Sequence, residues 1–352
     1  MAAQNSAPNL REEVTVLLGM LVFLILVNAV ATWILREHST NLAYQIIRSK
    51  WHLLLELQQP VDWLILGDSS CNQGVVPAVL EEQLGGRALN LCTIADLLVL
   101  NDAWMLEVYI RRFGPPPHVV LVHTYDMWYR NLQQTAMAQL PLPWGFWERL
   151  QPSLALSAQE QLRLWWVRYI PLYAEHRTLA RLVRSPRALL TQPLHLQEDG
   201  LMVVTSPNPD RVEREEAQQL EFVRTHRFQL SATNLQAIHH IVHLAQTHGI
   251  QVFIANAPIY QDLSAHAAFQ DYFAQVDAML RTVDQSSERV TYLAKPPLAF
   301  SKDEMDYADH VVGRAAETYT RDLASELRAA GAQELRHGLD AARTPVTTSE
   351  AP

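Results

Sequence analysis

The sequence is poor in cysteine and has no excess of positive charge. Only two of its 352 residues are cysteines, Cys71 and Cys92, and they fit no spacing of a zinc site. Lysine and arginine total 28 against 37 acidic residues, and the formal net charge of −9 leaves no basic surface for nucleic acid. This composition argues against a zinc-binding protein and against a nucleic-acid partner.

Motifs for metals and cofactors are scarce as well. His239, His240 and His243 lie on one expected helix, but no carboxylate or cysteine joins them at ligand spacing. The sequence therefore predicts no metal and no cofactor.

One long apolar run is present near the start of the chain. Residues 14–35 contain no charge and a single internal amide, Asn28, and at about 1.5 Å per residue they extend about 33 Å, enough to cross a bilayer core of about 30 Å. Trp33 and Arg36 stand at its end, where an aromatic ring and a cation suit the interface. A cleaved signal peptide is the alternative, but no basic segment precedes the run and no Ala-x-Ala site follows it closely. We therefore expect a polar N-terminus over residues 1–13 and then an uncleaved, single-pass anchor in the cell membrane.

The charges around this run leave the orientation of the chain open. A literal count of basic residues would place the following domain in the cytoplasm. That rule weakens for long domains, which cross the membrane largely regardless of charge. The flanking charges are Arg11, Glu12 and Glu13 before the run, and Arg36, Glu37, Arg48 and Lys50 after it.

The rest of the chain alternates short apolar runs with amphipathic segments. After a helical stalk over residues 36–60, apolar stripes at helical spacing separate runs that are bounded by glycine and proline. This order predicts a three-layer α/β/α domain over residues 61–330, around a mainly parallel, five-stranded sheet with right-handed crossovers. The expected strands are 61–66, 87–92, 118–123, 251–256 and 289–293.

A largely helical insertion, at about residues 130–230, breaks the alternation after the third strand. It leaves the sheet near its carboxyl edge, so we interpret it as a lid or an acceptor platform, or alternatively as a subdomain that only packs over the sheet edge. Its tryptophan-rich part could also lie on the lipid bilayer, because tryptophan favours the interface. The tail, residues 331–352, has the composition of disorder.

A serine directly follows the first expected strand. The residues Gly67-Asp68-Ser69 come after the buried run Trp63 to Leu66, and a helical segment follows at Val76 to Leu84. Glycine lets the backbone turn without a Cβ clash, and a serine here projects its hydroxyl into the crevice at the carboxyl edge of an open α/β sheet. An ordinary strand-ending turn would have the same residues, so this interpretation needs support from the rest of the chain.

A serine nucleophile needs a base, and a group that orients the base. Of the 14 histidines, His310 is best placed, because the loop after the last strand returns to the edge of the sheet where Ser69 is expected. We expect His310 at the start of the last helix, with Asp309 as the N-cap and Asp306 orienting the imidazole. Asp309 is the alternative for the orienting acid.

The two cysteines follow the ends of neighbouring strands. Cys71 lies two residues beyond Ser69, and Cys92 lies two residues beyond Asn90. If the strands are neighbours the thiols could meet, and a disulfide would fit an extracytoplasmic compartment. We interpret them instead as two small, buried, apolar side chains.

These motifs together resemble the SGNH (GDSL-type) hydrolase superfamily. The resemblance rests on Gly67-Asp68-Ser69 and on the Asp/His pair before the last helix, and it covers about residues 64–327. With the single N-terminal span, the layout is similar to a membrane-anchored branch that includes the teichoic-acid D-alanylation protein and the alginate O-acetylation proteins. Members of that branch accompany membrane-bound O-acyltransferases. Smaller agreements are Ala88-Leu89-Asn90-Leu91, the segment from Thr124 to Arg130, and Asn256-Ala257-Pro258. The resemblance implies a flavodoxin-like sheet of the SGNH type, with Ser69 as nucleophile and His310 as base.

The sequence departs from that superfamily at positions that matter for chemistry. The third block, Gly-x-Asn-Asp, is replaced by His123-Thr124-Tyr125-Asp126, and the second-block glycine is missing near Ala95-Asp96. The usual Asp-x-x-His spacing would place the acid at Tyr307. An oxyanion hole would then use the Ser69 N–H with Asn90 or Asn72, and a lost donor typically costs on the order of 10²–10³ in rate.

Two further residues are candidates to line the site. His123 ends a strand at the sheet edge, and the alternative is a buried histidine that is satisfied by the backbone. Asp126 could position a ligand together with Arg130, or the two could simply pair with each other.

The resemblance suggests three functions. The favoured one is an acyl-, and specifically acetyl-, transferase or esterase that modifies a cell-surface polysaccharide, with a membrane-bound O-acyltransferase as partner and an extracytoplasmic domain. The second is a non-catalytic assembly or glycan-binding factor that keeps the fold. The third is a membrane-tethered lipase or esterase.

Overall fold

The structure is a computed structural model that describes residues 10–38, 41–150, 156–170, 194 and 196–343, and positions 172, 176, 180 and 183–185. The chain forms two compact units. The smaller unit comprises Met1–Gln45, Gln134–Gln139 and Leu156–Pro193. The larger unit comprises Ile46–Gln133, Leu140–Ala155 and Leu194–Pro352.

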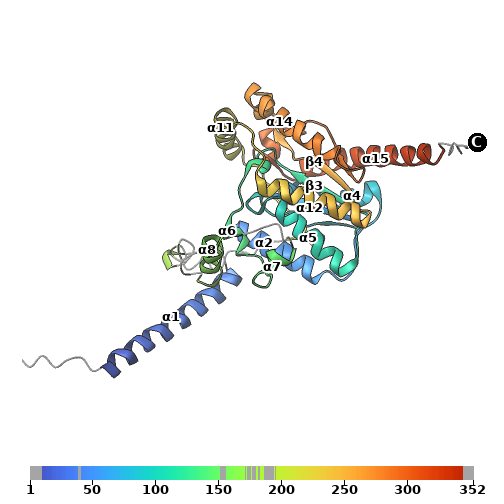
Figure 1. The fold of residues 1–352 in the computed structure, drawn as a ribbon. Coiled ribbons are helices and arrows are strands. Elements are labelled where there is room, and N and C mark those ends of the chain that lie inside the picture. Colours follow the sequence, from blue (N-terminus) through green and yellow to red (C-terminus); the bar gives the residue numbers. More distant parts are fainter. Residues whose placement is uncertain are drawn as a thin grey trace, which may run out of the picture. The chain divides into compact units, whose positions relative to one another are not determined.

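The larger unit is built on a five-stranded parallel sheet (Figure 1). Its order, β2-β1-β3-β4-β6, places the first strand of the chain between the second and the third, which is the flavodoxin-like order. The strands are almost wholly buried, as continuous apolar runs in a sheet covered on both faces must be. The predicted fold class is confirmed. The strands are β1 Trp63–Gly67, β2 Ala88–Asn90, β3 His118–His123, β4 Gln251–Asn256 and β6 Val290–Tyr292.

Helices cover both faces of this sheet. Helix α4 packs against α15, and α5 packs against α12. The crossover from β1 to β2 runs in the opposite direction to the one from β2 to β3, so right-handed connections place α4 and α5 on opposite faces. These are the three predicted layers. The main helices are α4 Pro77–Leu84, α5 Leu98–Phe113, α12 Ala232–His248, α14 Ala267–Asp284 and α15 Arg314–Arg343.

Two small sheets follow β4 that the sequence did not predict. Strands β5 (Ile259–Tyr260) and β7 (Ala299–Phe300) pair in parallel, and β8 (Met305–Tyr307) forms an antiparallel hairpin with β9 (His310–Val311). His310 therefore lies on a strand, and α15 begins only at Arg314. The expectation that His310 starts the last helix, with Asp309 as its N-cap, is wrong because this backbone pairs as a hairpin. Shorter helices are η1 Ala95–Leu97, η2 Met127–Tyr129, α7 Phe146–Leu150, α13 Gln261–Ala265 and η4 Lys302–Glu304.

Helix α2 (Leu42–Glu56) lies where a helical stalk was expected, over residues 36–60, but most of it is not a separate stalk. From Ile46 onward it belongs to the larger unit, and four of its side chains are fully buried. The Lys50 ammonium donates to the Asn90 carbonyl (2.9 Å), to the Asn90 Oδ1 (2.9 Å) and to the Gly200 carbonyl (2.6 Å). A buried lysine with three oxygen acceptors makes this helix part of the core. The four buried residues are Ile47, Lys50, Trp51 and Leu54.

The smaller unit contains the long apolar helix α1 (Leu10–His38), with α6 (Gln134–Met137) and α8 (Ala158–Tyr169). Within α1, Glu13–Ile34 has a mean hydropathy of 2.7 and is long and apolar enough to cross a membrane. In the part of the chain that the structure describes, no second helix meets that criterion. Helix α6 packs against α8.

The insertion is largely helical, but it does not form one subdomain. Residues 134–139 and 156–193 belong to the smaller unit, whereas 140–155 and the segment from 194 onward belong to the larger one. Helix α11 (Pro209–Thr225) packs against β8 and α14 in the larger unit. At the chain ends, α15 continues to Arg343, so residues 331–343 are helical where disorder was predicted. Residues 1–9 and 344–352 lie outside the described range.

Gly67 permits the close approach of β1 and β3 at the carboxyl edge. Its φ of +153° lies outside the range that other residues favour, and a Cβ added here would lie 2.0 Å from the Val122 carbonyl oxygen. Because that neighbour is backbone, only a movement of the strands could relieve the clash. A glycine is therefore required at this position.

We expect Gly67→Ala to destabilise the larger unit by about 3 kcal/mol or more, because the added methyl overlaps a strand carbonyl. Gly249→Ala is the matched control: Gly249 also has a positive φ, of +70°, in the left-handed helical region, but nothing lies within 4 Å of its added Cβ. Its cost should stay near 1 kcal/mol. Thermal unfolding of the full chain in detergent measures both, and equal shifts in Tm would contradict the clash.

Candidate functional site

Ser69 is the first residue of the short helix α3 (Ser69–Gly74), directly after β1 and the N-cap residue Asp68. It is half-buried, and its hydroxyl makes no hydrogen bond to any residue in the described ranges. The neighbouring Ser70 is fully buried and donates its hydroxyl to Asp68 Oδ1 at 2.6 Å. Of the two serines, Ser69 therefore has the available hydroxyl.

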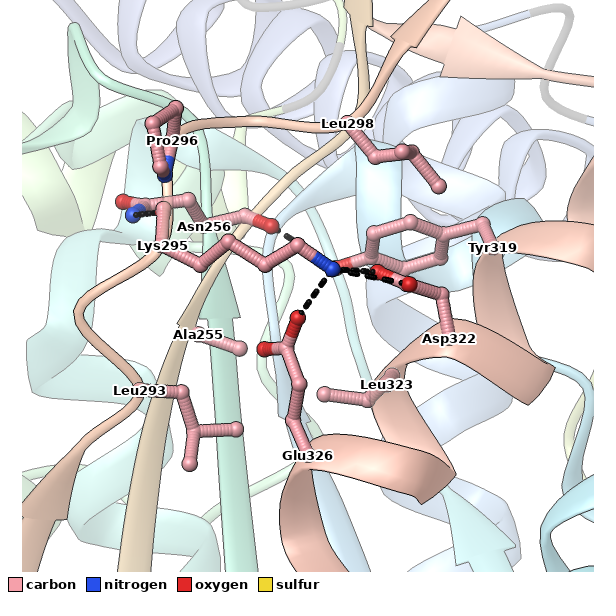
Figure 2. A pocket seen from close by; sticks show the side chains of 10 residues that line it. All are labelled: Ala255, Asn256, Leu293, Lys295, Pro296, Leu298, Tyr319, Asp322, Leu323 and Glu326. Carbon is pink, nitrogen blue, oxygen red and sulfur yellow. Dashed lines mark hydrogen bonds and ion pairs between the residues drawn. The ribbon is translucent and has the colours of Figure 1, made fainter. Parts of the chain in front are cut away.

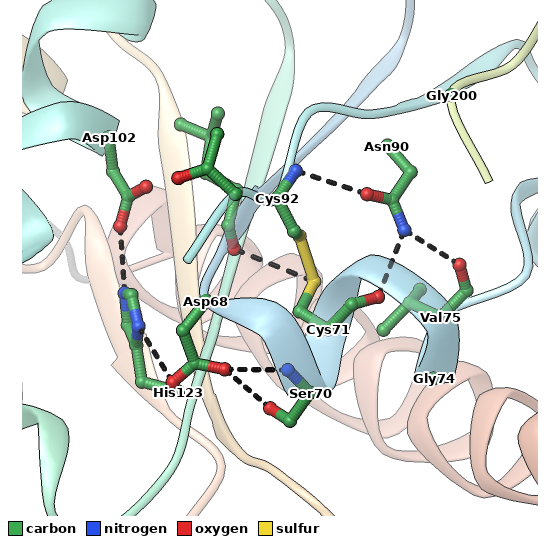
Figure 3. Close-up of a disulfide and its surroundings, with 12 residues drawn as sticks. Asp68, Ser70, Cys71, Gly74, Val75, Asn90, Cys92, Asp102, His123 and Gly200 are labelled. Carbon is green, nitrogen blue, oxygen red and sulfur yellow. Dashed lines mark hydrogen bonds and ion pairs between the residues drawn. A yellow bond between two sulfur atoms is a disulfide. The ribbon is translucent and has the colours of Figure 1, made fainter. Parts of the chain in front are cut away.

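Asp68 lies at the centre of a buried polar network (Figure 3). Its Oδ1 also accepts the Ser70 N–H at 3.0 Å, and its Oδ2 accepts the Thr124 N–H at 2.8 Å and the Thr124 hydroxyl at 3.0 Å. His123 Nδ1 lies 3.6 Å from Oδ2, which is an ion-pair contact and too long for a hydrogen bond. The other ring nitrogen, Nε2, lies 2.8 Å from Asp102 Oδ2.

The charges in this network determine one another. Burial alone would lower the pKa of His123, but the charge and hydrogen bond of Asp102, together with Asp68, raise it to about 9. Burial would raise the pKa of Asp68, yet its interaction with His123 and its bonds from Ser70 and Thr124 hold that pKa well below its usual range. Burial raises the pKa of Asp102 despite the nearby imidazolium. At neutral pH His123 is a cation beside the ionised Asp68.

His123 is thus a buried histidine, which agrees with the second of the two interpretations made from the sequence. Its partners are two carboxylates rather than the backbone. With a side chain only 1% exposed, it does not line an accessible site.

His310 lies on the β8–β9 hairpin, next to helix α3. Helix α3 packs against β9, and Gln73 Nε2 donates to the Val311 carbonyl at 3.3 Å. The helix that begins with Ser69 and the strand that begins with His310 are therefore neighbours, although about 240 positions separate them in the sequence. Asp68 also contributes to the electrostatic environment of His310.

Asp309, and not Asp306, holds the His310 ring. The His310 Nδ1 lies 2.5 Å from Asp309 Oδ1. Asp306 instead accepts two contacts from the Arg211 guanidinium, at 3.0 and 3.2 Å. The expectation that Asp306 orients the imidazole is corrected for this reason, and the alternative acid takes its place.

The environment of His310 favours its protonated form. Burial alone would lower its pKa, but the charge and hydrogen bond of Asp309 raise it above the usual value, and Asp68 and Glu215 add to the effect. Because Nδ1 faces Asp309, the ring presents Nε2 as its second nitrogen. That nitrogen makes no hydrogen bond within the described part of the chain and is the one that could take a proton.

Helix α11 packs against this hairpin, and the sequence did not predict that contact. Arg211 pairs with Asp306 and lies 4.5 Å over the Tyr307 ring, and Glu215 accepts the Ala308 N–H at 3.3 Å. The Asn208 N–H, just before the helix, donates to the Met305 carbonyl. The available sequence signal was Asn208-Pro209, which marks a capped helix start inside the polar stretch of the insertion.

Asn90 cannot act as the expected oxyanion donor. Its Nδ2 donates to the Cys71 carbonyl at 3.0 Å and to the Val75 carbonyl at 2.9 Å, which uses both of its hydrogens. Its Oδ1 accepts from the Cys92 N–H and from Lys50. This prediction is corrected because the amide is wholly engaged in structural bonds.

The remaining candidates differ in how they are engaged. Asn72 is fully buried, and its Nδ2 lies 3.6 Å from the Met202 sulfur. Asp126 pairs with Arg130, whose Nε lies 3.0 Å from Asp126 Oδ2, and its Oδ1 lies 2.8 Å from the Thr124 hydroxyl, whose single proton it shares with Asp68. Of the two interpretations of Asp126, the pairing with Arg130 is the one observed. The Ser69 N–H, at the first position of a helix, has no intrahelical acceptor.

Cys71 and Cys92 form a disulfide, which corrects the interpretation as two free thiols (Figure 3). The bond joins α3 to the segment just after β2. Together with the Asn90 bonds to Cys71 and Cys92, it fixes α3 beside the second strand.

A pocket beside the end of β4 contains none of the predicted site residues (Figure 2). The Lys295 side chain crosses it, and its ammonium contacts Asp322 at 2.7 Å and Glu326 at 2.6 Å. One ammonium faces two carboxylates, and the lysine side chain already lies across the pocket, so the pocket is poorly suited to an anionic ligand. The structure also shows, among the residues it describes, no cluster of three or more side chains suited to a metal, and His240 bonds to Glu107.

No family model matches the chain, and no curated protein sequence matches it. Among solved structures, one from Streptococcus pneumonia, provisionally described as a platelet activating factor, is similar to this chain. The two share 10% sequence identity and a TM-score of 0.36, over 85% of this chain and 98% of that one. A likeness at this level carries no argument about function, so the function must be argued from the site.

The raised pKa of His123 predicts a pH-dependent stability. The folded value of about 9 exceeds the unfolded value near 6.5, so the stabilisation is complete below pH 6.5 and is lost as the pH rises through 9. We expect the free energy of unfolding to fall by about 3 kcal/mol over this range.

His123→Gln should flatten this dependence, whereas His52→Gln, which changes an exposed histidine, should not. Denaturant unfolding of the full chain between pH 6 and pH 10 measures both variants. An unchanged slope in His123→Gln would show that another group causes the loss.

Proposed function

We propose that the larger unit is a serine-dependent acyl-transfer enzyme of the SGNH type. In this proposal Ser69 is the nucleophile, His310 is the general base, and Asp309 orients the imidazole. The observation that carries it is the packing of α3, with its unengaged Ser69 hydroxyl, against the hairpin that presents the Asp309–His310 pair. A carboxylate on one ring nitrogen and an unbonded second nitrogen are what a base in such a triad needs.

The proposed steps follow from this arrangement. The Ser69 oxygen attacks the carbonyl carbon of an ester while its proton passes to His310 Nε2. The tetrahedral intermediate expels the alcohol, which takes that proton, and leaves an acyl-Ser69 ester. An acceptor hydroxyl, or water, then attacks the ester with His310 again as base, and Ser69 is regenerated.

For the biological acceptor, we propose a sugar hydroxyl of a cell-surface polysaccharide and an acyl group, specifically acetyl, supplied through a membrane-bound O-acyltransferase. The support is the sequence resemblance described above, together with α1, which as an uncleaved anchor would hold the enzyme beside such a partner. The Cys71–Cys92 disulfide favours an extracytoplasmic domain, because disulfides persist in oxidising compartments.

A second candidate is a non-catalytic assembly or glycan-binding factor. The observation that favours it is Asn90, whose amide is fully engaged and cannot stabilise an oxyanion. Complementing a deletion strain with Ser69→Ala separates the two functions, because full surface acylation with that variant would favour the scaffold.

A fluorophosphonate probe tests the nucleophile directly. We expect covalent labelling of Ser69 in the full-length protein, loss of the label in Ser69→Ala, and retention in Ser70→Ala, since the Ser70 hydroxyl is held by Asp68. Peptide mass spectrometry identifies the labelled residue. A folded protein with no label on Ser69 would count against catalysis, and fast hydrolysis of simple p-nitrophenyl esters would favour an ordinary esterase over a transferase.

The labelling rate should depend on the protonation of His310. A base must be neutral, and Asp309 raises its pKa, so the rate should rise with pH with a midpoint above 6.5. Asp309→Asn should lower that midpoint and slow labelling by on the order of 10²–10⁴. Asp306→Asn should cost less than about tenfold and leave the midpoint in place, because Asp306 pairs with Arg211. The reverse pattern would restore Asp306 as the orienting acid.

A further inference from the structure

Helix α8, in the smaller unit, has an exposed stripe of large apolar side chains. Leu162, Trp165, Trp166 and Tyr169 follow the spacing i, i+3, i+4, i+7, so they lie on one face. They are 57, 42, 43 and 43% exposed. Leu164 and Val167, on the other side, are buried. The helix is therefore apolar on two sides, and the smaller unit covers only one of them.

The C-terminal end of α8 is joined to the candidate membrane span. Asn28 Nδ2 donates to the Tyr169 carbonyl at 2.7 Å. Asn28 lies inside the span Glu13–Ile34, six residues before its end, which corresponds to a depth of about 9 Å along the helix. The Tyr169 carbonyl is among the last of α8 and has no intrahelical donor, and in hydrocarbon neither group would tolerate being unpaired. The bond sets the depth at which α8 ends.

The polarity of α8 changes along its length in agreement with that depth. Its first turn is polar and carries a capping box, in which Ser157 and Glu160 bond reciprocally. The exposed aromatic residues all lie in its last two turns. The Arg168 guanidinium lies 5.8 Å over the Tyr169 ring and is partly buried. Tryptophan and tyrosine are typical of the membrane–water interface.

We propose that Leu162, Trp165, Trp166 and Tyr169 form a second membrane contact, in which the last turns of α8 lie in the interfacial region of the bilayer that α1 crosses. The occupant of this surface is phospholipid. Continuity with the span, through the Asn28–Tyr169 bond, is the argument for lipid rather than for a soluble partner. An amphipathic helix at such an interface buries its apolar face by about 5–10 Å, in keeping with the depth of Asn28. The proposal does not depend on the acyl-transfer chemistry.

Environment-sensitive labels on the full chain test this contact. Both native cysteines are in the disulfide, so a single added cysteine can be labelled with a nitrobenzoxadiazole dye. Trp166→Cys places the dye on the stripe, Gln159→Cys is the matched control in the polar first turn, and Trp165→Cys repeats the stripe measurement if one variant folds poorly. The proteins are reconstituted in vesicles of phosphatidylethanolamine and phosphatidylglycerol.

We expect brominated lipid to quench the dye at 166 at least about twofold more than the dye at 159, and aqueous iodide to show the reverse order. Iodide quenching at 166 equal to that at 159 would place the stripe in water and overturn the proposal. Shielding of residue 166 from both quenchers would also overturn it, because the stripe would then contact protein. Neither of these two outcomes would affect the acyl-transfer proposal, because that proposal is tested by the labelling of Ser69.

Discussion

The carboxylate of Asp68 holds two strand ends and one helix start together. It accepts two hydrogen bonds from Ser70 and one from the Thr124 N–H, and it shares the single Thr124 hydroxyl proton with Asp126. A buried charge of this kind is tolerated only when it is compensated, and the His123 imidazolium supplies the compensation. Asp102, on the far side of His123, then completes a buried chain of three titratable groups. The position of Ser69, one residue beyond Asp68, depends on this chain.

The parts of the fold that a local pattern encodes were predictable. Strands β3 and β4 begin and end at the predicted residues, because each apolar run is bounded by breakers, Pro115–Pro117 before one and Gly249 before the other. The parallel sheet and its three layers follow from the alternation of strands and helices, together with right-handed crossovers. The sequence also placed Ser69 directly after β1, and it placed His310 before the last helix, although the hairpin that carries His310 was not predicted.

The features that the sequence could not predict are set by contacts between residues distant in the chain. Asp306 and Asp309 are equally plausible acids by spacing, and the choice depends on Arg211, some 95 positions away, which pairs with Asp306. From the sequence alone, Asn90 is an uncommitted amide at a strand end. In the structure, its side chain bonds to Lys50 and to a carbonyl of α3. The buried hydrogen bonds of the same lysine make α2, which was expected to be a stalk, part of the core. In each case a tertiary hydrogen bond overrides what local composition suggests.

The engagement of Asn90 also constrains the chemistry that the site can support. Because the Asn90 amide has no hydrogen left to donate, an oxyanion would depend on backbone donors such as the Ser69 N–H. The loss of one donor lowers the rate by on the order of 10²–10³. A site weakened in this way is a poor general hydrolase. On the proposed function it would still serve a transferase, because an anchor that held donor and acceptor at the same membrane would replace part of the lost stabilisation with proximity. The span in α1 and the interfacial stripe on α8 would then contribute to catalysis by limiting the acyl group to acceptors near the membrane.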